Sequence, residues 1–251
     1  MTSARVIINA DDLGISEVVN DSIFDLMARR RVTSATVMAN GPAFRHAASK
    51  ITHFPRCSFG AHLNLTQFEP VTSGLDAARL TGANGFMSRS LQKERFGPKL
   101  LSATYQELCA QVDLLGSAGI ELSHFDSHHH VHTNPQLLPV IKALQKRYGI
   151  RKVRISKNIY TPQQPVSFTL ARKKMAYNWA LRNFYATRTT DGFTELLSYQ
   201  TEFGRRALSY RSVELMVHPG APYAAEEIAV LESDWLTASG LDARLISYNE
   251  L

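Results

Sequence analysis

Short runs of aliphatic and β-branched residues alternate along this chain with stretches whose apolar residues recur at helical spacing. The first apolar run predicts a buried strand over 5–9, and the next stretch predicts a helix over 15–32 with Ser16 as its N-terminal cap. The same reading predicts further strands at 34–40, 57–65, 122–128, 152–156, 212–220 and 243–249, and further helices at 43–51, 103–119 and 135–149. Gly119 and Gly149 are suitable helix ends.

Strands that alternate with helices are typical of a mostly parallel sheet with crossover helices. Seven strand candidates in 251 residues favour a closed or nearly closed barrel over a doubly wound sheet. No GxGxxG follows the first strand and no GxxxxGK[ST] occurs, so neither nucleotide-binding fingerprint is present. We therefore expect one α/β domain over 1–251, a distorted (β/α) barrel similar to a TIM barrel.

Two regions fit this alternation poorly. Residues 66–98 are punctuated by Gly, Pro and Ser and predict a long excursion, a candidate lid. Residues 157–210 are basic and aromatic, and 167–186 has the pattern of a helix. Aromatic and basic residues together are typical of a helix that lies on an anionic membrane surface, although a core-facing helix or a subunit contact is the simpler interpretation.

Composition and charge narrow the functional classes. The formal net charge is +6, and much of the surplus lies between Lys142 and Arg211. A basic surface suits nucleic acid, an anionic membrane or an acidic substrate, but no nucleic-acid-binding motif accompanies it, so we expect no nucleic acid partner and interpret the surplus as a solvated face. With only Cys57 and Cys109, no secretory signal pattern and no apolar stretch near ~20 residues, we expect a cytoplasmic protein.

Unusual polar residues follow four of the predicted strands. Asp11 and Asp12 follow the first, His62 and Asn64 end the third, the His-rich run starting with Asp126 and His128 ends the fourth, and His218 follows a late strand. In barrels and open α/β sheets the loops after the strands converge on one edge, so these side chains are expected to meet there.

The His-rich run is the strongest of these signals. Five of the nine histidines lie within 124–132, interrupted by apolar Phe125 and Val131, which a purification tag would not show. The polar residues after the other three strands could each have a purely structural role when they are considered alone. Asp11 and Asp12 suit a helix N-terminus, His62 suits a core position, and His218 suits a turn.

Taken together, the four segments predict metal-assisted hydrolysis. A divalent ion accepts histidine nitrogen and carboxylate oxygen, and keeps open positions for water and substrate. Water bound to such an ion loses a proton readily and attacks a carbonyl, a second carboxylate serves as general base, and an imidazole protonates the leaving amine.

Four motifs carry a family resemblance: NADDLG (9–14), GAHLNLT (60–66), HFDSHHHVHTNPQ (124–136) and MVHPG (216–220). In this order they resemble the YdjC/ChbG family of carbohydrate deacetylases, which includes chitooligosaccharide deacetylase and hopanoid-associated deacetylase-like proteins. The resemblance implies a distorted (β/α) barrel, one divalent metal ion (Mg²⁺ or Zn²⁺) and removal of an N-acetyl group from an N-acetylglucosamine-type mono- or oligosaccharide, free or lipid-linked. It also makes a homodimer a reasonable expectation.

Carried over motif by motif, the resemblance implies that Asp12, His62 and His128 are the metal ligands. It implies that Asp11 is the general base and His218 the acid. The remaining polar residues of the motifs are expected to support the ligands or face the substrate: Asp126, His130, His132 and Asn64.

Two other classes of function remain open on the sequence. A metal- or glycan-binding protein without catalysis would enclose its ion completely. A metallo-phosphoesterase on a similar barrel suits the positive charge, but the chain offers few carboxylates that could bridge two metals.

Overall fold

The computed structural model describes residues 4–203, 210–238 and 242–251. Its strands form one parallel sheet in the order β5-β4-β3-β2-β1-β7-β6, and β8 also pairs with the start of β1. The strands are β1 (Ala4–Leu13), β2 (Ser34–Val37), β3 (Ser58–Leu63), β4 (Leu122–Ser127), β5 (Lys152–Val153), β6 (Gly192–Glu195), β7 (Ser212–Val217) and β8 (Ala243–Leu245).

The sheet curls until its edge strands β5 and β6 approach each other. An isolated parallel bridge joins Lys152 to Arg188, and the Asn158 N–H donates to the Phe193 carbonyl at 3.3 Å. The ladder between β5 and β6 is otherwise incomplete among the described residues, so the barrel is distorted and partly open. The predicted distorted (β/α) barrel is therefore confirmed.

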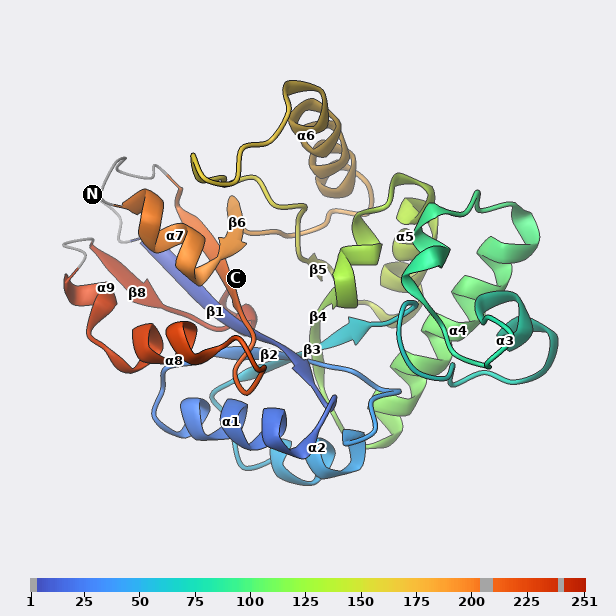
Figure 1. The fold of residues 1–251 in the computed structure, drawn as a ribbon, viewed down its shortest axis with the longest axis horizontal. Helices are drawn as coiled ribbons and strands as arrows, with labels where there is room; N and C mark the ends of the chain where they lie inside the picture. Colours follow the sequence, from blue (N-terminus) through green and yellow to red (C-terminus); the bar gives the residue numbers. More distant parts are fainter. Residues whose placement is uncertain (1–3, 204–209, 239–241) are drawn as a thin grey trace.

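The helices lie around the outside of the strands (Figure 1). They are α1 (Glu17–Ala28), α2 (Phe44–Ile51), α3 (Gly74–Leu80), α4 (Pro98–Ser117), α5 (Leu138–Tyr148), α6 (Phe168–Asn183), α7 (Leu196–Phe203), α8 (Ala225–Glu232) and α9 (Trp235–Ala238). In α1 the predicted apolar positions other than Val18 face the core, and Ser16 accepts the Val19 N–H at 3.2 Å as the cap. No helix in the described part of the chain is long and apolar enough to cross a membrane.

Several elements differ from the prediction. The first strand extends beyond 5–9 to Leu13, while the strands expected at 152–156 and 243–249 are only two and three residues long. Strand β6 and helices α3, α7, α8 and α9 were not predicted, because they are short and their apolar pattern is weak. Residues 204–209, which belong to the second excursion, lie outside the described residues.

The C-terminal segment closes the amino end of the barrel. After β8 the chain forms a 3-10 turn (Tyr248–Glu250), and the fully buried Tyr248 ring stacks on His124 with 3.5 Å between ring centroids. His124 in turn lies against Gly60, where a Cβ atom would come within 2.5 Å of the imidazole ring. Gly60 is thus required for this interior packing.

Candidate metal centre and active site

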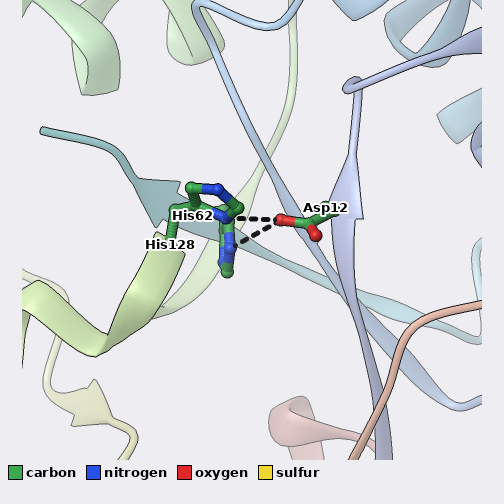
Figure 2. Close-up of side chains that lie close together, drawn as sticks. All are labelled: Asp12, His62 and His128. Atoms are coloured by element: carbon green, nitrogen blue, oxygen red, sulfur yellow. Dashed lines mark ion pairs between the residues drawn. The ribbon is translucent and has the colours of Figure 1, made fainter. Parts of the chain in front are cut away.

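Three side chains from distant parts of the chain converge at the carboxyl end of the barrel (Figure 2). Asp12 comes from the end of β1, His62 from β3 and His128 from the turn after β4. Asp12 Oδ1 lies 3.1 Å from His62 Nε2 and 2.8 Å from His128 Nδ1. These are the three residues that the sequence implied as metal ligands, and the fold brings them together.

A local irregularity in β1 separates the two neighbouring aspartates. Consecutive residues of a regular strand point to opposite faces. Here the pairing of β1 with β2 shifts between Ala10 and Leu13, and Asp12 has a left-handed φ of +66°. As a result Asp11 is buried in the barrel interior, while Asp12 faces the imidazoles at the mouth. Bulges of this kind re-aim side chains beside active sites.

Each imidazole is oriented by a partner on its other nitrogen. His62 Nδ1 lies 2.8 Å from Asp126 Oδ1 and 3.0 Å from the Thr36 hydroxyl, which leaves Nε2 directed toward Asp12. His128 Nε2 lies 2.8 Å from Gln67 Oε1, which leaves Nδ1 directed toward the same atom of Asp12. A carboxylate behind a histidine is a usual support for a metal ligand.

The donor set fits a divalent cation. Asp12 Oδ1 is buried and has no hydrogen bond of ordinary geometry, although two imidazole nitrogens lie within 3.1 Å of it. Burial alone would lower the pKa of His62, but the nearby carboxylates of Asp126 and Asp12 outweigh burial and raise it to about 10. The centre therefore holds excess negative charge, which a bound cation would neutralise in place of a proton.

Below this centre, Arg154 holds three buried carboxylates. Its guanidinium makes two 2.7 Å contacts to Asp11, one of 2.7 Å to Asp126 Oδ2 and one of 2.8 Å from Nε to Glu214. All four side chains are at most 3% exposed. We call Asp11, Asp126, Arg154 and Glu214 the arginine cluster, and Asp12, His62 and His128 the imidazole cluster.

The arginine cluster sets the charges around the site. Burial would raise the pKa of Asp11, yet Arg154 outweighs it and holds that pKa well below its usual range, so Asp11 is ionised. For Glu214 burial prevails over the attraction of Arg154, and its pKa rises to about 7. The Tyr248 hydroxyl donates to Glu214, which links the cluster to the C-terminal turn.

His218 lies at the end of β7, close enough to Asp11 for its charge to help lower the pKa of that carboxyl. Its backbone N–H donates to the Glu227 carboxylate at 2.7 Å, and its ring centroid lies 6.0 Å from that of Tyr223. His218 is half-buried.

The other predicted site residues occupy different surroundings. Asp126 supports His62, as described above. His130 is half-buried, and burial together with Arg154 lowers its pKa to about 4, so its ring is neutral. His132 is fully buried, its Nδ1 contacts the Ser127 hydroxyl, and its Nε2–H donates to the Arg154 carbonyl at 3.2 Å. Asn64 is also buried and donates to the Gln67 carbonyl at 2.6 Å, so it shapes the turn that carries Gln67.

Sequence reasoning missed Arg154, Glu214 and Gln67. A signal for the first two existed, because each is a charged residue within a predicted buried strand. Gln67 belongs to the first excursion, 66–98, which also sends Arg89 to His129, with 3.1 Å between Nε and Nε2. This excursion therefore lies against the turn that carries His128.

Comparison with known proteins identifies the family. Residues 5–241 match the family model described as YdjC-like protein. The chain belongs to this family. A carbohydrate deacetylase of Geobacillus stearothermophilus is 34% identical over 265 residues, which cover 97% of this chain and 96% of that relative. A carbohydrate deacetylase of Vibrio campbellii is 39% identical over 148 residues, which cover 58% of this chain and 57% of that relative.

A solved structure supports the fold of this YdjC-like chain. A protein from Enterococcus faecalis, provisionally named for cellobiose-phosphate cleavage, superposes with a TM-score of 0.80 over 99% of both chains at 24% sequence identity. The likeness confirms the architecture and says nothing further about the substrate.

Proposed function

We propose that this YdjC-like chain is a metal-dependent hydrolase that removes the N-acetyl group from an amino sugar. The observation that carries the proposal is the convergence of Asp12, His62 and His128 directly above the ionised carboxylate of Asp11. The names of the relatives, carbohydrate deacetylases, supply the substrate class. The substrate is an N-acetylglucosamine-type mono- or oligosaccharide, free or lipid-linked.

The imidazole cluster would hold the cation, which when bound would polarise the amide carbonyl and make a water more acidic. Its two nitrogens and one oxygen favour Zn²⁺ over Mg²⁺, since Mg²⁺ is held mainly by oxygen. Asp12 is 16% exposed at its side chain, so the cluster is open toward the mouth, as a catalytic centre requires.

Asp11 takes a proton from the attacking water at one of its carboxylate oxygens. The bidentate contact with Arg154 fixes the plane of this carboxylate and keeps it charged, which makes Asp11 a well-positioned but weak base. His218, which directly follows β7, donates a proton to the leaving amine nitrogen. Asp126 and Gln67 keep the two imidazoles in the required orientation.

Acetate release from a panel of N-acetylated sugars, with and without a chelator, tests the reaction. Asp11→Asn is expected to keep the metal and lose turnover by at least about 100-fold, the usual range for a general base. Asp12→Ala is expected to lose the metal itself, measured by elemental analysis. Equal metal loss in both variants would contradict this division of roles.

Phosphoester hydrolysis is a weaker candidate on this geometry. Asp11, His62 and Asp126 also lie within 4.8 Å of one another, but the Arg154 guanidinium already bonds both carboxylates. A second cation has no place there, so a two-metal mechanism is disfavoured. Release of phosphate from p-nitrophenyl phosphate without release of acetate from any sugar would reverse this order.

The cellular compartment is also part of the proposal. Cys57 and Cys109 are both free thiols, as suits a reducing compartment, and we propose the cytoplasm.

A further inference from the structure

Helix α6 leaves most of its apolar side chains in solvent. Six of the ten exposed large hydrophobic residues in the described part of the chain lie between 168 and 185. Within the helix only Tyr177, Asn178 and Leu181 are buried. Figure 1 shows α6 at the periphery of the molecule, at the top of the view, with the sheet below it. The sequence alone favoured a core-facing helix or a subunit contact here, and the exposure of these residues shows that most of the apolar side chains of α6 do not face the core.

Three of the exposed apolar residues of α6 form one stripe. Phe168, Met175 and Trp179 are spaced by seven and four residues, so they share one side of the helix. They are 74%, 66% and 63% exposed. At about 100° per residue, this side lies well away from the line through Tyr177 and Leu181 that packs on the body.

The helix that carries this stripe is strongly basic. The sixteen residues of α6 include Arg172, Lys173, Lys174 and Arg182 and no acidic residue. The Arg172 guanidinium lies 5.4 Å from the centre of the Phe168 ring, so a positive charge sits within the apolar stripe itself. Phe184 and Tyr185 extend the exposed aromatic surface beyond the end of the helix.

We propose that the α6 stripe, defined by Phe168, Arg172, Met175 and Trp179, docks on an anionic lipid bilayer. Aromatic and aliphatic side chains enter the interface between headgroups and acyl chains, while adjacent basic groups pair with anionic headgroups. A second copy of this chain is a poorer occupant. A two-fold contact would set α6 against α6 and would bring like charges together at the same patch.

The helix is attached firmly enough to orient the body on such a surface. Asn178 exchanges hydrogen bonds with the backbone of Ser156 at 2.8 and 3.1 Å, and Lys142 donates to the Leu181 carbonyl at 2.6 Å. The Tyr177 hydroxyl donates to the carbonyl of His132, which lies in the same turn as the predicted ligand His128. Docking through α6 therefore fixes the position of the active-site turn relative to the bilayer. The proposal itself does not depend on the reaction.

Sedimentation of the purified chain with lipid vesicles tests the docking surface. Vesicles of phosphatidylcholine containing about 30% phosphatidylglycerol are expected to bind the chain, and pure phosphatidylcholine at least about tenfold less. Raising the salt from about 0.05 M to about 0.5 M is expected to release the chain, since salt screens these charges. Met175→Ala/Trp179→Ala and Arg172→Glu/Lys173→Glu should each lower the bound fraction at least about tenfold.

Matched controls change exposed apolar and exposed basic residues elsewhere on the chain. Val18→Ala/Leu75→Ala removes two apolar side chains that are 71% and 77% exposed on other helices, and Arg45→Glu/Arg56→Glu makes the same charge change. Circular dichroism verifies that each variant folds. Absence of binding to anionic vesicles at low salt, or equal losses in the control variants, would overturn the proposal. So would a concentration-dependent dimer that Met175→Ala/Trp179→Ala dissociates while vesicle binding stays unchanged.

Discussion

Asp11 and Asp12 are neighbours in the chain, yet they belong to two clusters of opposite character. In the arginine cluster, Arg154 contacts Asp11, Asp126 and Glu214 in ordinary ion-pair geometry. In the imidazole cluster, the donor atoms approach one point without an ordinary hydrogen bond to Asp12 Oδ1. The first cluster is internally compensated, and the second is arranged for a group that comes from outside.

This contrast shows how the same residue types serve structure in one place and chemistry a few ångströms away. A buried carboxylate with a guanidinium is neutralised by the protein itself. A carboxylate that faces two imidazoles, and that helps to raise the pKa of His62, has lone pairs available for a cation instead. The bulge in β1 creates the contrast, because it directs Asp11 inward and Asp12 to the mouth.

Removal of the positive charge of Arg154 should have the largest effect on stability. Arg154→Met leaves Asp11, Asp126 and Glu214 buried without their partner, and about 3–5 kcal/mol of unfolding free energy should be lost. Urea unfolding measures this loss. Arg182→Met is the control, because Arg182 is half-buried and bonds only Thr189 and the Thr190 carbonyl among its described contacts. A loss below about 1 kcal/mol in Arg154→Met would show that the arginine cluster is not a structural unit.

The imidazole cluster should instead gain stability from an added metal. At a Zn²⁺ concentration 100-fold above the dissociation constant, binding to the folded chain alone adds about 2.7 kcal/mol. We expect this gain in the wild-type chain and in Asp11→Asn, and its absence in Asp12→Ala, measured by thermal unfolding of metal-free protein with and without Zn²⁺. An equal gain in all three would place the metal elsewhere.

The sequence predicts the imidazole cluster better than the arginine cluster, for a physical reason. Asp12, His62 and His128 lie in short motifs at strand ends, and parallel strands bring such ends to one edge. Arg154 directly follows the short strand β5, and its partners Glu214 and Asp11 are 60 and 143 positions away. Only the curvature and register of the closed sheet reveal that these charged residues face the same interior.

In the two excursions, too, the sequence pattern predicted the segment but not the contacts or the exposure of its side chains. Residues 66–98 were predicted as a candidate lid, but no periodicity pointed to Gln67 as the partner of His128. In 157–210 the helix was predicted almost to its bounds, whereas its exposed side was not. Hydrophobic spacing identifies a helix, but an apolar side that faces solvent has the same pattern as one that faces the core.

A pH titration of stability should separate Glu214 from the other carboxylates. Its folded pKa of about 7 lies above the ordinary value of 4.5, so its contribution is complete below pH 4.5 and is lost as the pH rises toward 7. Relative to Glu214→Gln, which does not titrate, the wild-type chain should lose at least about 1.4 kcal/mol over this interval, the equivalent of one pKa unit. Urea unfolding at pH 5 and pH 7 provides the measurement. Parallel pH dependence in the two proteins would mean that Arg154 keeps Glu214 ionised throughout.

The smallest effect is expected at the amino end of the barrel. Tyr248→Phe removes the hydroxyl that donates to Glu214 but keeps the ring that stacks on His124, so a loss of about 1 kcal/mol is expected. Because the hydroxyl stabilises the carboxylate form, the loss should be larger at pH 8 than at pH 5. In a double-mutant cycle with Glu214→Gln most of it should disappear, whereas additive losses would mean that Tyr248 only fills space. Coupling would extend the arginine cluster from Asp11 to the C-terminal turn, while metal binding at the imidazole cluster stays unchanged.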